Sequence, residues 1–154
     1  MHVYLIRHGD AKSKQEDPER SLSVKGTQDV RKMAAFLKPL DLAVEVVWHS
    51  GKARAAQTAE LLGGAVSSAN GVGKRDGLAP MDPVEPIGAE LASASRDVML
   101  VGHLPFMGKL ASALVAGTES ADVVAFQPGS VACLERIDAG NWILCWMATP
   151  DLLP

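Results

Sequence analysis

The stretch His2-Val3-Tyr4-Leu5-Ile6 runs directly into Arg7-His8-Gly9, and this junction decides the fold. The short apolar run predicts a buried β-strand, which Gly9 and the polar residues after it bring to an end. Ligands of open α/β sheets bind outside the carboxyl ends of the strands. Arg7 and His8, a basic pair placed immediately after the first strand, are therefore the first candidates for a binding or catalytic site.

Strands and helices are expected to alternate over the residues that follow. The stretch 12–20 is polar, lacks a hydrophobic period and predicts a loop. Ser23 is a suitable N-cap for a helix whose apolar residues recur at helical spacing up to Leu37, and Pro39 ends it. Further on we expect a strand over 44–48, a helix capped by Ser50 and reaching residue 62, a surface connection over 65–86 with one short strand, a helix over 87–94, a strand over 97–101 and a helix over 104–116.

The last part of the chain has a different pattern. After Gly117, the stretches 123–126, 131–137 and 142–148 read as successive strands joined by tight turns. Antiparallel strands at one edge of a mostly parallel sheet fit this order. We therefore predict an α/β fold, a three-layer sandwich with a mostly parallel central sheet and antiparallel edge strands.

Cys133 and Cys145 are the two cysteines, and both fall in these last strands, where buried free thiols are expected. If residues 138–141 close a hairpin in which Ile137 faces Trp142, Cys133 lies opposite Trp146 and Cys145 lies opposite Leu134. In this register the two thiols point to opposite faces of the sheet.

The composition is that of one soluble globular domain. The chain has 154 residues, of which 47% are hydrophobic and 21% are charged, and its formal net charge is −3. Residues 1–154 are thus expected to form a single domain whose partners include neither nucleic acid nor an anionic membrane. The first apolar run is too short for a signal peptide, and no run reaches the roughly 20 residues of a membrane span, so we expect a cytoplasmic protein.

Basic residues follow three of the expected strands. Arg7 and His8 follow the first strand, His49 follows the second with Arg54 one turn into the next helix, and His103 follows the third. The carboxyl ends of parallel strands meet at one edge of a sheet, so two arginines and two histidines of this set are predicted to converge. Gathering several cations in one place requires a compensating anion.

These residues resemble the histidine phosphatase superfamily, which has the phosphoglycerate mutase-like fold. Four motifs occur in the family's order: Leu5-Ile6-Arg7-His8-Gly9, then Leu22-Ser23-Val24-Lys25-Gly26-Thr27-Gln28, then residues 50–59 as S-x-x-x-R-A-x-Q-T-A, then Val101-Gly102-His103-Leu104-Pro105. Within the superfamily, the short chain, Asp10-Ala11 after the first motif and Arg20-Ser21-Leu22-Ser23 are most similar to the SixA-like phosphohistidine phosphatases.

The resemblance implies a phosphatase without metal or other cofactor, in which His8 is the nucleophile and forms a phosphohistidine that water then hydrolyses. A backbone carbonyl near Gly9 is expected to orient the second ring nitrogen of His8. Arg7 and Arg54 would bind the phosphoryl oxygens with planar donor forks, and His103 would add a further donor. Gly9 is included among the phosphate-binding residues.

Arg20 is the next candidate, as the arginine that lines the pocket edge in SixA-like proteins. Ser50 is interpreted as a helix cap rather than a ligand, while His2 and His49 are expected to be structural. Gly51 departs from the family's usual Ser-Pro sequence, which loosens the first helical turn without removing a polar contact.

The general acid is not fixed by any motif. Asp82 and Glu85 lie in the connection after Arg54, and Asp10 adjoins His8; each is a possible acid or orienting group. An imidazole leaving group demands less protonation than an alkoxide, so a missing acid favours phosphohistidine as substrate.

Four functions remain open from the sequence. The first is a phosphohistidine phosphatase in signal transduction that acts on a phosphorylated protein, such as a histidine phosphotransfer domain. The alternatives are a broad small-molecule phosphomonoesterase with Asp82 or Glu85 as acid, a catalytically idle phosphoprotein-binding module, and a metal site built from His8, His49 and His103. Nearby arginines and the lack of ligand spacing disfavour the metal site, so no metal is expected.

Overall fold

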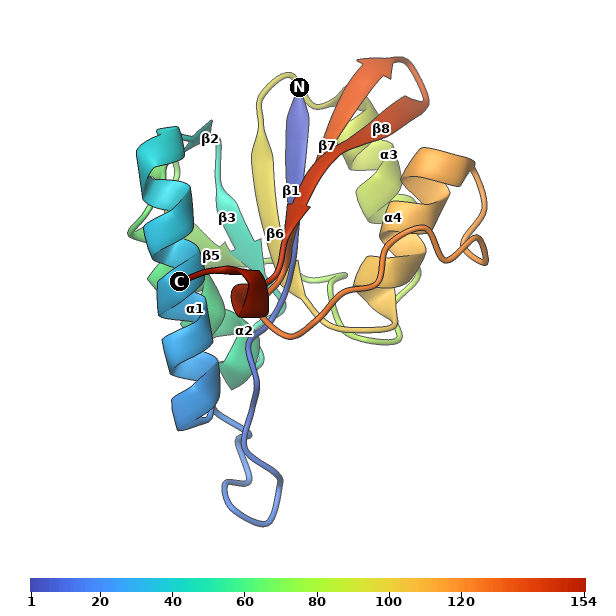
Figure 1. Cartoon of the computed structure of the whole chain (residues 1–154). Helices are drawn as coiled ribbons and strands as arrows, with labels where there is room; N and C mark the ends of the chain where they lie inside the picture. The colour runs from blue at the N-terminus through green and yellow to red at the C-terminus, as the bar shows by residue number, and fades with distance from the viewer.

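A computed structural model describes residues 1–154 and shows three layers (Figure 1). The central sheet has six strands in the order β5-β3-β6-β1-β7-β8. Strand β1 (His2–Arg7) pairs in parallel with β6 (Val98–Gly102) and antiparallel with β7 (Val131–Asp138). The predicted mostly parallel sheet with antiparallel edge strands is confirmed.

The first strand is buried on both faces and joins two separate cores. Val3 and Leu5 belong to the core beneath α3 (Glu85–Ser93) and α4 (Phe106–Ala116). Tyr4 and Ile6 belong to the core beneath α1 (Val24–Leu37) and α2 (Ala53–Gly63) on the other face (Figure 1). Because strand side chains alternate between faces, one continuous apolar run serves both helical layers.

Several predicted elements are present with small shifts in their ends. Ser23 caps α1, where its side chain accepts a hydrogen bond from the Gly26 N–H, and η1 (Lys38–Leu40), a short 3₁₀ turn containing Pro39, follows the helix. The helices predicted over 87–94 and 104–116 are α3 and α4. The connection over 65–86 contains two short strands rather than one, β4 (Ser67–Ser68) and β5 (Val72–Lys74).

Two predicted strands differ from the structure. Residues 123–126 form no strand; Phe126 is buried in one core, and its carbonyl accepts a hydrogen bond from Arg7. The strand predicted over 44–48 is split into β2 (Ala43–Val44), which pairs with β4 in a separate two-stranded sheet, and β3 (Val47–His49), which pairs with β5 and β6. The β-branched residues correctly predicted an extended backbone, but the two halves of this segment pair with strands of different sheets.

The hairpin of β7 and β8 (Asn141–Ala148) corrects the predicted cysteine geometry. Cys133 does pair with Trp146, but the next pair is Leu134 with Leu144, so Cys145 falls in a β-bulge. A bulge adds one residue to one strand and shifts the alternation of faces. The sulfur atoms of Cys133 and Cys145 therefore lie within 4.8 Å of one another, not on opposite faces, and Cys145 is exposed rather than buried.

The chain ends after η2 (Pro150–Leu152), which lies against α1 (Figure 1). None of the helices has the length and hydropathy required to span a membrane.

Candidate active site

The residues that follow the three neighbouring parallel strands β1, β6 and β3 lie at the same edge of the sheet. β1 ends in Arg7 and continues to His8, β6 ends in Gly102 before His103, and β3 ends in His49 before Ser50. The His8 N–H donates to the Gly102 carbonyl at 2.9 Å, which extends the β1–β6 pairing to the candidate residues themselves. The predicted convergence of the strand ends is thus present.

His8 is held in one orientation by two ring contacts. Its Nδ1 lies 2.7 Å from the Gly9 carbonyl oxygen, and Arg54 Nε donates to its Nε2 at 3.3 Å. A carbonyl oxygen can only accept, so Nδ1 carries the proton and Nε2 carries the lone pair. The contact with the Gly9 carbonyl is the one predicted from the sequence.

The surroundings of His8 favour its neutral form. Burial is the largest cause that lowers the pKa of His8 to about 4, and Arg54, Arg7 and Arg20 lower it further, against an opposing effect of the Gly9 hydrogen bond. Because this pKa lies well below 7, the ring holds no second proton at pH 7. Its Nε2 lone pair is therefore available for nucleophilic attack.

His103 is buried beside His8, with 2% of its surface exposed and the two ring centroids 5.0 Å apart. Its Nε2 lies 2.6 Å from Ser50 Oγ, while its buried Nδ1 has no hydrogen-bond partner. Burial first, then His8 and nearby cations, lower the pKa of His103 to about 3. A buried polar atom without a partner is costly, and a bound anion or protonated group would satisfy it.

The role of Ser50 differs from the predicted helix cap. Lys52 is the N-cap of α2 and makes no side-chain cap bond, whereas the Ser50 hydroxyl accepts from the Lys52 N–H at 3.3 Å and also contacts His103. Gly51 between them has φ +93°, a left-handed conformation that proline cannot adopt because its ring fixes φ near −65°. A proline at this position would therefore require a different backbone path into the helix.

Three arginines around His8 have no carboxylate partner. None of the ion pairs in the molecule includes Arg7, Arg20 or Arg54. Arg7 donates from one terminal nitrogen to the Phe126 carbonyl at 2.9 Å and leaves a buried Nε without a partner. Arg20 Nε donates to the Lys12 carbonyl at 3.1 Å. Unpaired guanidinium groups are suited to bind the oxygens of a phosphoryl group.

An open cavity of about 730 Å³ adjoins these cations. Arg20 and Arg54 line it together with Lys14 and Lys52, against the carboxylates of Glu19 and Asp82, so its rim is basic although the whole chain carries a net charge of −3. The cavity gives a large substrate direct access to the arginines.

The structure separates the three acidic candidates. Asp82 lines the same cavity, where its side chain accepts from the Ala79 N–H at 2.9 Å. Asp10 accepts a hydrogen bond from the Ser23 hydroxyl at 2.6 Å and so holds the start of α1. Glu85 lines a different cavity, between α3 and α4, and is not brought to the histidines.

Two residues to which the sequence assigned no role fasten neighbouring segments to α2, and one of them, Thr58, positions the turn after the nucleophile. Thr58 Oγ1 accepts from the Gly9 N–H at 3.1 Å and donates to the Arg54 carbonyl at 2.7 Å, which ties the turn after His8 to α2. Gln57 accepts from the Leu22 N–H at 2.7 Å. Both belong to the S-x-x-x-R-A-x-Q-T-A motif, so the motif contained the signal although no chemistry was assigned to it.

The model of the histidine phosphatase superfamily (branch 1) matches residues 3–85, which is more than half of the chain. This chain belongs to the histidine phosphatase superfamily. Among curated proteins, it is similar to phosphohistidine phosphatase SixA of Escherichia coli strain K12, with 29% identity over 97% of this chain and 94% of that protein.

Solved structures agree with this assignment to the histidine phosphatase superfamily. A protein histidine phosphatase SixA complexed with tungstate is 29% identical over 99% of both chains, with a TM-score of 0.84. Phosphoserine phosphatase from Entamoeba histolytica, 13% identical over 96% of both chains with a TM-score of 0.70, shares the fold alone. The chain is a SixA-like member of the superfamily and a phosphatase.

Proposed function

We propose that this chain is a phosphohistidine phosphatase that removes the phosphoryl group from a histidine-phosphorylated protein, such as a histidine phosphotransfer domain. The similarity to SixA over nearly the whole chain supports this substrate class. We also propose that residues 1–154 act as one histidine phosphatase domain, in a cytoplasmic signalling pathway.

The observation that carries the proposal is the state of His8. Its Nδ1 donates to the Gly9 carbonyl, and its lowered pKa leaves Nε2 unprotonated at neutral pH. This nitrogen attacks phosphorus, the substrate P–N bond breaks, and the departing imidazole takes up a proton. Water then attacks the phosphoryl group on His8, which releases inorganic phosphate and regenerates the neutral ring.

The arginines and His103 stabilise the charge that spreads over the phosphoryl oxygens. Arg7 Nε and His103 Nδ1 are the two buried side-chain atoms without partners, and phosphoryl oxygens would satisfy Arg7 directly. His103 donates from Nδ1 in its neutral form, with Nε2 then accepting from the Ser50 hydroxyl. Arg54 and Arg20 complete the clamp, and Gly9 fixes the turn that orients the nucleophile.

The leaving group decides between the candidate substrates. Imidazole leaves a phosphoramidate with little assistance, whereas an alkoxide requires a general acid. Of the three acidic candidates, Asp10 is bonded to the N-cap Ser23 and Glu85 lies elsewhere, so Asp82 is the one that reaches the cavity, which Glu19 also lines. Neither His8 nor His103 is hydrogen-bonded to a carboxylate, and this lack of a placed acid favours phosphohistidine over a phosphate ester.

Catalysis in this proposal uses no metal. Phosphoryl charge is met by guanidinium groups, and the atoms of His8, His49 and His103 do not gather into one set of three metal ligands. The test is to incubate EDTA-treated protein with a histidine-phosphorylated protein and with p-nitrophenyl phosphate, alongside His8→Ala. We expect rapid loss of phosphohistidine that requires His8, and slow ester hydrolysis.

Asp82 supports one alternative, a small-molecule phosphomonoesterase, because it lines the cavity with Arg20 and Arg54. Faster hydrolysis of the ester, with a large loss in Asp82→Asn, would favour that function. If neither substrate were turned over but the phosphorylated protein still bound, the chain would be a phosphoprotein-binding module.

A further inference from the structure

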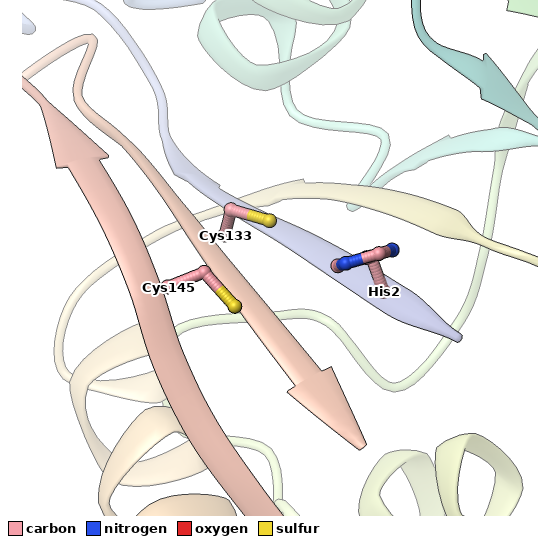
Figure 2. Close-up of side chains that lie close together, drawn as sticks. All are labelled: His2, Cys133 and Cys145. Carbon is pink, nitrogen blue, oxygen red and sulfur yellow. The ribbon is translucent and has the colours of Figure 1, made fainter. Parts of the chain in front are cut away.

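Three soft or borderline ligands meet at the end of the sheet where β1 begins. His2 comes from β1, Cys133 from β7 and Cys145 from β8, and their ligand atoms all lie within 4.8 Å of one another (Figure 2). We propose that these three side chains form a Zn²⁺ site, which is separate from the phosphatase centre.

Strand register brings the three residues together. β1 pairs with β7 so that His2 faces Glu135 and Tyr4 faces Cys133, which places His2 and Cys133 diagonally across neighbouring strands. The bulge in β8 then moves Cys145 beside Cys133, on the face from which His2 also approaches (Figure 2). A regular hairpin would have separated the thiols, so the bulge creates the cluster.

The spacing fits a tetrahedral zinc ion after small side-chain rotations. Zn–S bonds of about 2.3 Å and Zn–N bonds of about 2.0 Å place neighbouring ligand atoms roughly 3.5–3.8 Å apart. The three ligand atoms lie within 4.8 Å of one another in the structure. Cys145 and half-buried His2 have room to rotate because neither is in the core. A water molecule would occupy the fourth position.

Carboxylates surround the cluster. Asp97 Oδ2 lies 3.4 Å from His2 Nδ1, and Asp97 Oδ1 accepts from the His2 backbone N–H at 2.6 Å. A carboxylate on one ring nitrogen is the arrangement that orients zinc-binding histidines. Glu135 Oε2 lies 3.7 Å from Cys145 Sγ and adds negative charge on the other side.

Both cysteines are free thiols, so each must lose its proton before it binds a metal ion. Burial, followed by Cys145, Asp97 and Glu135, raises the pKa of Cys133 to about 12, and burial with Glu135 raises the pKa of Cys145. Thiolate attack is therefore disfavoured in the free protein. Zn²⁺ binding displaces one proton from each thiol, and the two thiolates then balance the charge of the ion.

This site lies apart from the phosphatase centre. His2 begins β1, whereas Arg7 ends it and His8 follows, so His2 and the nucleophile lie at opposite ends of the same strand. A zinc ion here would cross-link the first strand to the edge hairpin of β7 and β8. It would stabilise the folded state to the extent that its affinity for the folded chain exceeds its affinity for the unfolded chain.

The test is a metal titration of the full chain after treatment with EDTA and a thiol reductant. We expect one equivalent of Zn²⁺ to bind, measured by competition with a chromogenic chelator. One equivalent of Co²⁺ should give near-ultraviolet thiolate-to-cobalt charge-transfer absorption and the intense visible bands of tetrahedral coordination. Neither readout depends on phosphatase activity.

Cys145→Ser is the main variant because Cys145 is exposed and its loss leaves the core intact. It should reduce the thiolate-to-cobalt charge-transfer absorption and weaken Zn²⁺ binding by more than about 100-fold, since even the loss of a group that hydrogen-bonds a metal ligand costs 10- to 100-fold. Asp97→Asn, which keeps the shape of the carboxylate, should weaken binding by about 10- to 100-fold.

His49→Gln is the matched control, because this histidine lies outside the cluster, and its Zn²⁺ affinity should equal that of the unmodified chain. Equal Zn²⁺ affinity in the unmodified chain and in Cys145→Ser would overturn the proposal. So would a Co²⁺ spectrum without thiolate bands, or the finding that both thiols stay reactive toward a thiol reagent at saturating Zn²⁺.

Discussion

At the scale of single residues, His8 combines a cationic setting with a neutral ring. Its pKa lies at about 4 because burial and the arginines Arg54, Arg7 and Arg20 disfavour the imidazolium. We predict that the His8 ring, followed by NMR, stays neutral with the proton on Nδ1 from pH 8 down to about pH 5. Ring protonation already at pH 6, near the ordinary value of 6.5, would contradict this assignment.

The same shift has a consequence for stability. The folded-state pKa of His8 lies below the unfolded value, so the unfolded chain binds more protons as the pH falls from 6.5 towards 4. His8 therefore contributes to a loss of folding stability over this window. Arg54→Gln removes a nearby positive charge and should raise the pKa of His8 and narrow the window, which chemical denaturation at several pH values would measure.

Arg54 shows why charge alone is insufficient at this site. Its Nε donates to His8 Nε2 at 3.3 Å, and the rest of its fork remains for a phosphoryl group. Arg54→Lys keeps the charge but loses the fork, and we predict a fall in kcat/KM of about 10²- to 10³-fold, as for removal of one oxyanion donor.

Arg75→Lys is the control for this loss, because Arg75 pairs with Glu90 and stacks over Trp48 outside the cavity. Its kcat/KM for the phosphorylated protein should remain within about twofold of the unmodified enzyme, as expected for a change away from the site. A loss in Arg54→Lys no larger than that in Arg75→Lys would mean that the guanidinium fork of Arg54 is not required.

At the scale of elements, α1 packs against the turn after His8 through a glycine. A Cβ on Gly26 would lie 2.0 Å from the backbone oxygen of Asp10. We predict that Gly26→Ala destabilises the fold by about 1–3 kcal/mol through overpacking, against the usual gain of alanine in a helix. Urea unfolding monitored by circular dichroism would give the free energy.

Gly88 in α3 is the matched glycine, because a Cβ there meets nothing within 4 Å. Gly88→Ala should stabilise the fold by up to about 1 kcal/mol. Destabilisation of similar size in both variants would show that contact with Asp10 is not the cause.

The hydrophobic pattern and the residues that follow the strands were sufficient to predict the fold class and much of the candidate site. The buried run 3–6, the caps and the periodic helices gave the α/β fold, and the residues after three strands gave His8, Arg54 and His103 in one place. Local sequence patterns did not predict features that depend on which distant segments pair with one another. The sequence around residues 123–126 does not reveal that the Phe126 carbonyl accepts a hydrogen bond from Arg7. The sequence around Cys145 does not reveal the β-bulge in β8.

Side-chain contacts across the chain were equally hidden from the sequence. Ser50 reads as a helix cap because it precedes a helix, yet its hydroxyl contacts a histidine 53 positions away. Asp10 and Glu85 were equal candidates for the acid until the fold placed one at the cap of α1 and the other in a different cavity.

At the scale of the whole molecule, a chain with a net charge of −3 holds an unpaired cationic cluster. Such a cluster opposes folding until an anion binds, so anions should stabilise this protein. At 100 times its dissociation constant, tungstate should stabilise the fold by about 2.7 kcal/mol and raise Tm by roughly 5–10 °C. Arg54→Gln should lose most of this shift, whereas chloride at matched ionic strength should produce none.

The basic rim should also determine how the enzyme meets its substrate. Lys14 and Lys52 are exposed and line the cavity, where they would attract the proposed substrate, if it is an acidic phosphorylated protein, over a Debye length of about 10 Å at 0.1 M salt. We predict that kcat/KM for the phosphorylated protein falls steeply as salt rises, and that Lys14→Gln with Lys52→Gln flattens this dependence. Hydrolysis of p-nitrophenyl phosphate should respond little, because a small substrate reaches the arginines directly.

The paired control removes two exposed lysines elsewhere, Lys38→Gln with Lys109→Gln, and so changes the net charge equally. If steering comes from the rim, this control keeps the salt dependence of the unmodified enzyme. If it comes from total charge, both double variants flatten the curve alike, and the cavity rim has no special role. The comparison thus separates a local field at the mouth of the site from the weak field of the whole molecule, which has the wrong sign to attract an acidic protein.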